Sequence, residues 1–414
     1  MSSTALPALP DAGDRPALLA WVREQLGDLT LEGPDGVRAS ERFAGGQAAA
    51  DAALGAYDVA GYARRRNEVW PAERRGASAL SPYIRHGLLP LPRVWDAVDG
   101  GPAPDVRKFR DELQWQEYAR HLYARLGART GQALRRTPAP LPADSRWPDP
   151  WPREMACMDL TVGELERDGW LVNQTRMWLA SQWTVRAGHD WAAGEDRFFA
   201  HLLDGSRAAN RLGWQWTVGT ASKPYGFSRW QVEKRAPGLC GRCPLRDDCP
   251  IQGWPPDRSG AAVADVPDAL RADPSPDVTG GPERPVLSGD PDAVWLTAES
   301  LGQADPALAA HPDLPAVFVF DQERLARWRL SGKRLVFLAE TLAGLAAGGR
   351  ALELHRGDPA AVLRGRPVAA TFTPVPGWRA IAAAVDPAAV HPWPWLTRPH
   401  GGRMQSFSAW RRAS

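Results

Sequence analysis

Apolar residues recur at helical intervals through most of the first half of the chain. The pattern begins at residues 15–29 and returns repeatedly between Glu41 and Leu212. Proline- and glycine-bearing turns separate its individual pieces. We therefore expect this half to be predominantly α-helical, with its clearest helical pieces at residues 51–66, 109–127, 160–188 and 196–213.

The pattern changes twice in the second half. Residues from Pro255 to Pro291 are rich in Pro, Ala, Asp and Gly, which predicts a flexible linker. After it, short β-type runs alternate with helical segments such as residues 333–348, which predicts a small parallel-sheet, Rossmann-like α/β domain. These runs are residues 293–298, 316–321, 351–357 and 368–374.

The expected fold class is thus a multidomain protein, with a mostly helical domain followed by a small α/β domain. We divide the chain into four parts, namely an N-terminal helical extension (1–40), a helical domain (41–254), a linker (255–287) and an α/β domain (288–414).

Composition limits the possible partners. The chain has 414 residues, and 50 basic against 48 acidic side chains leave a formal charge of +2, so an anionic partner must be bound by a local patch. Its 20 tryptophans outnumber 10 phenylalanines and 6 tyrosines, which indicates either core packing or a use of indole rings. We find no basic and apolar leader and no run of about 20 apolar residues, so we expect a cytoplasmic protein with no membrane partner. We also expect it to be a monomer.

The cysteines predict a metal site. Cys240, Cys243 and Cys249 stand within ten residues, and Cys157 lies upstream. Four cysteines are too few for a disulfide scaffold in so long a chain. Thiolates suit either zinc or an iron-sulfur cluster, and the spacing does not separate the two; four free structural thiols are the remaining alternative.

Three sequence blocks carry a family resemblance. They are SALSPYIRHGLL at residues 78–89, FRDELQWQEYARH at residues 109–121, and NQTRM, DW and DGSRAANRLGWQW between residues 173 and 216. In this order they resemble the FAD-binding helical domain of the cryptochrome/photolyase family, over residues 42–255. The resemblance implies a bound FAD.

The resemblance also implies which residues would contact FAD. Tyr62 and the turn with Ser78, Leu80 and Ser81 would hold the phosphates, and Phe109 would pack against the cofactor. Around the isoalloxazine ring, Arg176 would pair with Asp204, while Asn210 would face the ring nitrogen whose protonation sets the redox state. An ordinary salt bridge between helices is the alternative for that pair. The expected set of cofactor contacts is completed by Gln116 and Asn173.

The resemblance further implies a substrate. Glu112, Trp115, Met177 and Trp216 match the positions that line the cavity above the flavin in photolyases that repair cyclobutane pyrimidine dimers. Together with Asn210 they are the expected catalytic residues, and UV-damaged DNA is the expected partner. For the two tryptophans, core packing is the alternative.

Two further tryptophans resemble the family's electron relay. Trp214 and Trp191 match its first two members, and the sequence leaves the third open among Trp147, Trp151, Trp178 and Trp183.

Other features indicate a subfamily. Cys157 and the later cysteines, with ASKPYGF and GLL, resemble the bacterial branch that carries a four-iron four-sulfur (4Fe-4S) cluster, so we expect that cluster rather than zinc. Several positions depart from the family pattern: Ala79 and Gln116 replace arginines, Ser206 an aspartate and Val172 a histidine. Without a histidine pair at Val172 and Asn173, repair of (6-4) photoproducts is not expected.

The order of the domains is unusual for this family. In this family the antenna-type α/β domain normally comes first in the chain. Here, residues 293–363 and the tail with Phe407 and Trp410 resemble that domain. This indicates a circular permutant, with an unrelated nucleotide-binding module as the alternative. No residue identifies an antenna chromophore.

The function expected from the resemblance is light-driven repair of pyrimidine dimers. The alternatives are a cryptochrome-like blue-light photosensor without repair activity and a structural iron-sulfur nucleic-acid binder.

Overall fold

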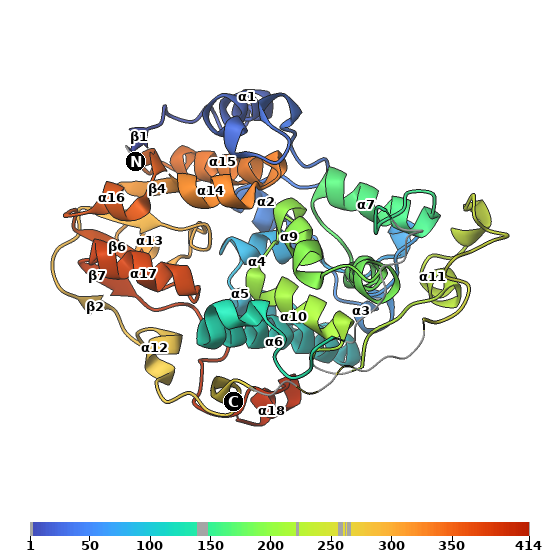
Figure 1. The fold of residues 1–414 in the computed structure, drawn as a ribbon. Coiled ribbons are helices and arrows are strands. Elements are labelled where there is room, and N and C mark those ends of the chain that lie inside the picture. Colours follow the sequence, from blue (N-terminus) through green and yellow to red (C-terminus); the bar gives the residue numbers. More distant parts are fainter. Residues whose placement is uncertain are drawn as a thin grey trace.

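The computed structural model describes residues 3–138, 148–220, 223–255, 260, 262 and 266–413. They form a helical half and an α/β half, as the hydrophobic pattern predicted (Figure 1). The helical half contains the α-helices α2 (Gln47–Gly55), α3 (Tyr62–Arg65), α4 (Ser81–Arg85), α5 (Leu91–Asp96), α6 (Ala103–Leu126), α7 (Ala156–Asp168), α8 (Asn173–Ser181), α9 (Trp191–His201), α10 (Arg207–Val218) and α11 (Arg229–Arg235), with the π-helical turn η5 (Gln182–Arg186) and the 3₁₀ turns η3 (Ala72–Arg74), η4 (Gly127–Gly131) and η6 (Cys240–Arg242).

The α/β half is built on one sheet. Its strands are β1 (Thr4–Ala5), β2 (Val286–Leu287), β3 (Ala293–Leu296), β4 (Ala316–Asp321), β5 (Leu352–Gly357), β6 (Val368–Thr371) and β7 (Ala389–His391). The elements around them are α1 (Arg15–Leu26), η1 (Gly27–Leu29), η2 (Pro34–Gly36), α13 (Pro306–Ala310), α14 (Gln322–Trp328), α15 (Gly332–Ala347), α16 (Pro359–Leu363) and α17 (Pro376–Val385). Three further elements pack against α6 of the helical half, namely η7 (Asp268–Leu270), α12 (Pro276–Gly280) and α18 (Phe407–Ala413).

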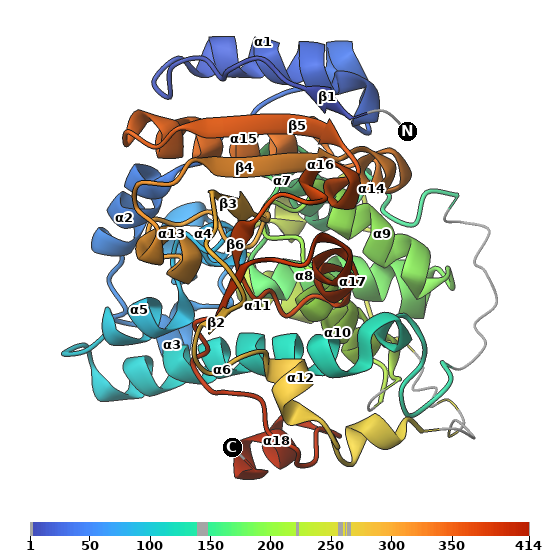
Figure 2. The same ribbon diagram turned by 90° about the vertical axis from the view of Figure 1, so that its left-hand side faces the viewer.

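The strand order is β1-β5-β4-β3-β6-β7-β2, and the labels of β1, β5, β4, β3, β6 and β2 follow one another from top to bottom in Figure 2. The five central strands are parallel to one another. All four residues of β3 and five of the six in β4 are buried, as expected for parallel strands covered on both faces. The expectation of a parallel-sheet α/β domain is confirmed.

Helix α15 joins the two halves. It is apolar around most of its circumference, and nearly all its side chains are buried. Leu335 and Val336 belong to the core beside the sheet, whereas Phe337 packs into the helical core near Phe43 and Tyr83. Because one helix supplies both cores, the two halves are packed together rather than tethered.

The N-terminal segment does not stand apart from the α/β half. Strand β1 pairs antiparallel with β5 and forms one edge of the sheet, and α1 packs along α15 (Figure 2). Trp21, Val22 and Leu26 enter the core beside the sheet. The helix over 15–26 was predicted correctly, but its packing partner lies more than 300 residues later in the chain and leaves no local signal.

Part of the expected flexible linker is ordered. Within residues 266–287, β2 adds an antiparallel edge strand beside β7. The indole of Trp395 donates to the carbonyl of Gly280 (2.8 Å), and the guanidinium of Arg398 donates to that of Gly281 (2.6 Å). The prediction of flexibility is therefore wrong for these residues, because distant polar side chains hold a backbone that has few apolar anchors of its own. Residues 256–259, 261 and 263–265 lie outside the described residues.

The helical pattern over 160–188 is interrupted. Helix α7 ends at Gly169, whose φ of 68° lies in the left-handed region, and α8 begins four residues later. A Cβ atom at residue 169 would also stand 2.9 Å from the carbonyl oxygen of His201. The break turns α8 so that its first residues reach the centre of the molecule. Among the residues that the structure describes, no helix combines the length and the apolarity that crossing a bilayer would require.

Candidate functional site

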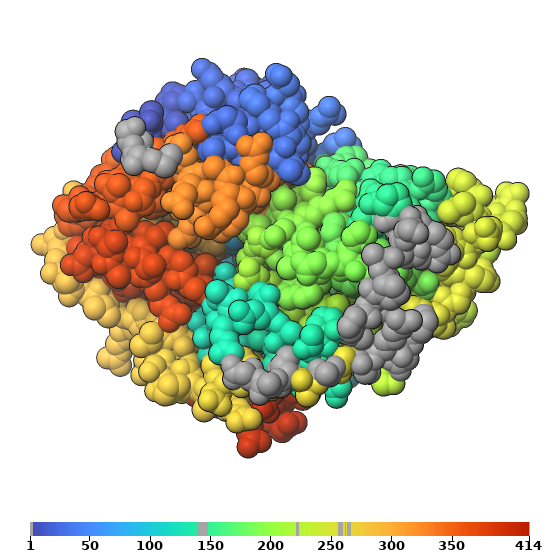
Figure 3. All heavy atoms as spheres, viewed as in Figure 1, coloured from blue at the N-terminus to red at the C-terminus, as the bar shows by residue number. Residues whose placement is uncertain are grey.

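A cavity of about 1160 Å³ lies between the two halves of the molecule. Its opening corresponds to the hollow between the orange-red and the teal-green parts in Figure 3. Helices α3, α4, α6, α8 and α10 line one side, and the carboxyl ends of β3 and β4 line the other. The lining includes most of the residues expected at the flavin and the substrate, namely Tyr62, Ser78, Ser81, Glu112, Trp115, Gln116, Asn173, Arg176, Met177, Asp204, Asn210, Trp214 and Trp216.

An ion pair stands at the bottom of the cavity. The guanidinium of Arg176 on α8 lies 2.6 Å from Oδ2 of Asp204, and it also donates to the carbonyl of Leu171 (3.0 Å). The hydroxyl of Ser81 donates to the same carboxylate oxygen (2.6 Å), while the indole of Trp170 donates to that hydroxyl (3.0 Å). The expected pairing of Arg176 with Asp204 is present, and the side chain of Ser81 holds Asp204 in place.

Three buried polar atoms beside this ion pair lack partners. Oδ1 of Asp204, Nδ2 of Asn210 and Nε1 of Trp214 have no hydrogen-bond partner among the described residues. All three residues line the cavity. Because leaving such atoms unpaired costs about 1–3 kcal/mol each, a polar ring bound here would be stabilised. One acceptor and two donors in this lining match the mixed acceptor and donor groups of an isoalloxazine ring.

The rim of the cavity carries the expected substrate residues. Trp115 on α6 and Trp216 on α10 are 39% and 41% exposed, unusually open for tryptophan. Glu112 lies one turn from Trp115 and pairs with Lys108 (2.8 Å) and more loosely with Arg66 (3.5 Å). Met177 lines the same cavity. Aromatic surfaces beside a carboxylate and two cations can stack a base and contact nucleic acid.

Other expected residues lie behind the cavity wall. Leu80 is fully buried in the helical core, where Phe109 packs against Tyr57 and Tyr62 at ring-centroid distances of 5.3 and 5.0 Å. Phe109 therefore supports Tyr62, which lines the cavity. Ala79, one of the departures from the family pattern, has a φ of 57° and bends the chain sharply before α4.

Three tryptophan rings form a path, called the ring path below, that leads from the cavity wall into the helical core. The ring of Trp214 lies 6.3 Å from that of Trp183, which in turn lies 5.0 Å from that of Trp151. Trp191, the expected second member of the relay, is buried in the same core at the start of α9. Of the candidates for the third member, Trp178 packs instead against Phe227 (5.9 Å). Trp147 lies outside the described residues.

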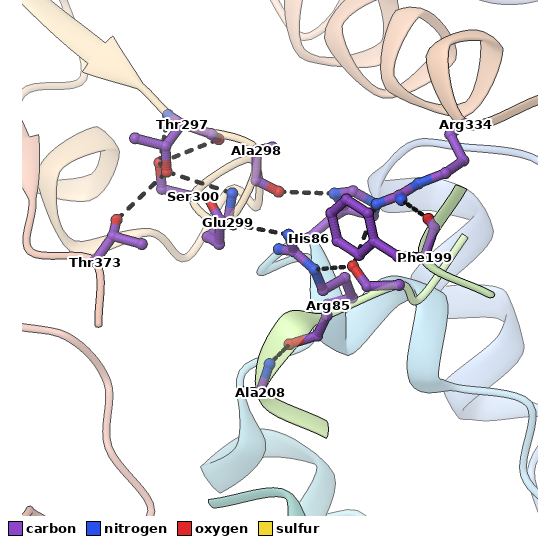
Figure 4. Close-up of polar contacts among 12 residues, drawn as sticks. Arg85, His86, Phe199, Ala208, Thr297, Ala298, Glu299, Ser300, Arg334 and Thr373 are labelled. Atoms are coloured by element: carbon purple, nitrogen blue, oxygen red, sulfur yellow. Dashed lines mark hydrogen bonds and ion pairs between the residues drawn. The ribbon is translucent and has the colours of Figure 1, made fainter. Parts of the chain in front are cut away.

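A polar bridge closes the cavity wall between the two halves (Figure 4). The guanidinium of Arg85 pairs with Glu299 (2.8 Å) and donates to the carbonyl of Gly205 (2.9 Å). Beside it, a ring nitrogen of His86 lies 2.7 Å from the carbonyl oxygen of Ala298. Burial lowers the pKa of His86 to about 3, so this ring is neutral at physiological pH. Arg334, whose pKa burial lowers to about 9, stays charged and donates to the carbonyl of Phe199.

The four cysteines come together in space. Cys157 on α7 and the three cysteines around η6 line one small cavity, together with apolar side chains such as Leu239 and Ile251. The thiol of Cys243 also accepts a hydrogen bond from the backbone of Ala156 (3.4 Å). Within the described ranges, no three His, Cys, Asp or Glu side chains are already spaced to hold a metal ion. The structure therefore gathers the four thiols around one small cavity without showing a metal site among the described residues.

Comparison with known proteins identifies the helical half. Residues 109–233 match the family described as the FAD binding domain of DNA photolyase. This segment is therefore similar to the FAD-binding domains of DNA photolyases. It contains Glu112, Trp115, Asn173, Arg176 and Asp204, whose arrangement in the cavity is described above. FAD binding, expected from the sequence, is thereby supported.

Full-length relatives match over part of their length. A deoxyribodipyrimidine photo-lyase of Synechococcus sp. is 30% identical over 190 residues, which are 40% of this chain and 36% of that protein. One of Thermus thermophilus is 32% identical over 243 residues, or 53% of this chain and 50% of the relative. A cryptochrome DASH of Gloeobacter violaceus is 27% identical over 283 residues, or 63% and 53%. The chain thus spans between about a third and about a half of these relatives, and over that part it is similar to deoxyribodipyrimidine photo-lyases and to a cryptochrome DASH.

Some residues of the site were not expected from the sequence. Lys108 could have been found, because its spacing of four residues from Glu112 on a helix predicts an ion pair. Trp170 and Glu299 give no such signal, since their partners Ser81 and Arg85 lie far away in the chain. The same holds for Phe407, which stacks on Trp115 from the C-terminal helix.

Proposed function

We propose that this protein is a light-driven DNA repair flavoprotein that splits cyclobutane pyrimidine dimers. The observation that carries the proposal is a single cavity with unpaired buried polar atoms at its bottom and two open indole rings at its rim. Asn173, Arg176, Asp204 and Asn210 would hold the isoalloxazine ring. The remaining contacts of FAD would come from Tyr62, Ser78, Ser81 and Gln116.

The protein's own residues would bind and orient the dimer. When bound, light-excited reduced FAD would supply one electron to the dimer and would regain that electron after the dimer has split, so the reaction has no net redox change. Trp115 and Trp216 offer stacking surfaces for a dimer flipped out of the DNA strand. Glu112 would accept hydrogen bonds from the base edges, and Lys108 and Arg66, which pair with it, would bring positive charge close to the DNA backbone.

Repair of an oligonucleotide with one cyclobutane thymine dimer tests this function. With FAD reduced and under blue light, the protein should restore intact thymines, whereas the dark reaction should not. Glu112→Ala should lower the repair rate at limiting substrate by about ten- to a hundredfold, since a hydrogen bond to a charged group is worth about 1.5–3 kcal/mol.

The matched control for Glu112 is Asp159→Asn, an exposed carboxylate on α7 that is 58% open to solvent. Its repair rate should equal that of the unmodified protein. Absence of repair by FAD-loaded, reduced protein in the light would contradict the proposed function.

A cryptochrome-like photosensor without repair activity is the second candidate. The observation that favours it is the ring path from Trp214 through Trp183 to Trp151, which suits electron transfer towards the flavin site. Gln116 and Ala79, where relatives have arginines, favour it as well. Light-driven flavin reduction that depends on Trp183, together with equal affinity for damaged and undamaged DNA, would establish this function instead.

We further propose that the four cysteines hold a 4Fe-4S cluster that ties the segment around η6 to α7. The support is their common cavity and its apolar surroundings. When bound, the cluster would cross-link Cys157 to three ligands more than 80 residues later in the chain. Zinc is the alternative for the same four thiolates.

Metal and sulfide analysis tests the cluster. Anaerobically purified protein should contain about four iron and four acid-labile sulfide atoms per chain, and Cys157→Ser should lose most of both. Met158→Leu, the next position on the same helix, should keep them. One zinc per chain without sulfide would replace the cluster by a zinc site.

The domain order is also a proposal. We interpret the α/β half as the family's antenna domain placed after the helical half by circular permutation. Its parallel sheet and its close packing through α15 support this interpretation. The cavity reaches Trp295 and Phe318 at this sheet, so an antenna chromophore of unassigned type would lie near the flavin.

A further inference from the structure

The C-terminal helix reaches the rim of the proposed substrate site. The ring of Phe407, the first residue of α18, stacks on the ring of Trp115 with a centroid distance of 4.1 Å and an angle of 15°. Tyr118 meets both rings edge-on, at 5.7 Å from Trp115 and 5.9 Å from Phe407. The three rings form one cluster, and Phe407 and Trp115 both line the cavity.

The segment that carries Phe407 is firmly attached to α6. The hydroxyl of Tyr118 donates to the carbonyl of Met404 (2.9 Å), and Arg411 pairs with Asp111 (2.8 Å). Trp410 is 1% exposed, and its indole donates to Nδ1 of His121 (2.9 Å).

The histidine in this contact has one consistent protonation state. Its Nδ1 accepts from Trp410, and its Nε2 lies 2.8 Å from the carbonyl oxygen of Thr397, to which it donates. Burial lowers the pKa of His121 to about 3, in agreement with a neutral ring. The contact therefore holds α18 in one place over the physiological pH range.

This attachment determines what Trp115 can do. An indole that is 39% exposed at the surface of a helix would ordinarily sample several rotamers. A ring stacked flat on one face, and a second ring at its edge, favour a single orientation. The part of Trp115 that remains open then faces the cavity in a fixed position, and no ordering of that side chain is needed when a base stacks on it.

We propose that Phe407 is a positioning residue for the damaged base, and that it acts by holding the ring of Trp115. The inference rests on the proposed function, because it assigns Trp115 to the pyrimidine dimer. It makes α18, at the end of the chain, a part of the DNA-binding site.

Binding of fluorescently labelled oligonucleotides tests the inference. The probes are one strand with a single cyclobutane thymine dimer and the same strand undamaged, with the FAD-loaded protein kept in the dark. Phe407→Leu keeps an apolar side chain but removes the ring, and it should weaken binding of the dimer about three- to tenfold, the range of an aromatic pair. Binding of the undamaged strand should change by less than about twofold.

Two further variants and three further properties of Phe407→Leu separate positioning from a general loss of structure. Phe407→Tyr keeps the ring and should restore dimer binding, whereas Arg412→Ala, an exposed side chain on the same helix, should leave it unchanged. In repair assays Phe407→Leu should raise KM and leave kcat near that of the unmodified protein. Its FAD content and its melting temperature should remain close to normal.

The outcomes distinguish this inference from the proposed function. If unmodified protein prefers the dimer and Phe407→Leu prefers it equally, the positioning role is excluded while the function stands. Tighter dimer binding by Phe407→Leu would also exclude it, because Phe407 would then obstruct the site. If unmodified protein does not distinguish the two strands, both the function and the inference are wrong.

Discussion

Replacing Arg176 with alanine should leave the protein folded but nearly free of FAD. The guanidinium of Arg176 is the cation next to Asp204, whose side chain is only 6% exposed. Without it, a buried carboxylate remains that has lost its charge partner, which costs about 3–5 kcal/mol. We expect the affinity for FAD to fall by at least about a hundredfold, measured as flavin absorbance per chain after gel filtration and by titration of apoprotein.

Two variants make this result specific. Arg153→Ala removes an arginine that also pairs with carboxylates but is 44% exposed, and its FAD content should be unchanged. Arg176→Lys should retain part of the FAD, since lysine keeps the charge but cannot contact both Asp204 and the carbonyl of Leu171 through a planar group. Full FAD content in Arg176→Ala would show that the flavin lies elsewhere.

Replacing Trp115 with alanine should abolish most of the preference for damaged DNA while FAD stays bound. Stacking of a base on an aromatic side chain is worth about 1–3 kcal/mol. The affinity for a strand with one thymine dimer should therefore fall roughly ten- to a hundredfold. The flavin should remain, because Trp115 lies at the rim of the cavity and Arg176 and Asp204 lie at its bottom.

Trp230→Ala is the matched control for this prediction. Trp230 is even more exposed, at 59%, and its ring contacts Lys234 on its own helix at 4.8 Å. Its removal should not change the ratio of affinities for damaged and undamaged strands. An equal loss of this ratio in both variants would indicate that exposed indoles bind DNA nonspecifically and that Trp115 has no particular role.

Some elements could be predicted because their signal is local. The helix at residues 15–26 and the strand at residues 316–321 carry the apolar spacing of their own type, and the structure confirms both. The helical pattern over residues 160–188 was read as one piece, since a single glycine gives little evidence of a break. The left-handed backbone at Gly169 is what separates α7 from α8.

The candidate site was predicted in a different way. The resemblance of the motifs around Glu112 and Arg176 to a known family predicted which residues form the site. The structure brings most of these residues together in one cavity. That resemblance did not predict the roles of neighbouring residues. Ser81 was expected at the phosphates, but its hydroxyl contacts Asp204, and only the position of α4 beside the segment between α9 and α10 creates that contact.

The sequence by itself determined where most of the helices and the central strands lie, and that three of the thiols stand close together in the chain. These properties depend on residue type and spacing along the chain, whereas the side chains expected at a flavin followed from the family resemblance. The tertiary structure alone decided that β1 and β2 complete the sheet, that Glu299 closes the cavity wall against Arg85, and that Phe407 lies on Trp115. Those contacts join residues more than 100 positions apart, so tertiary packing rather than any local pattern brings them within reach.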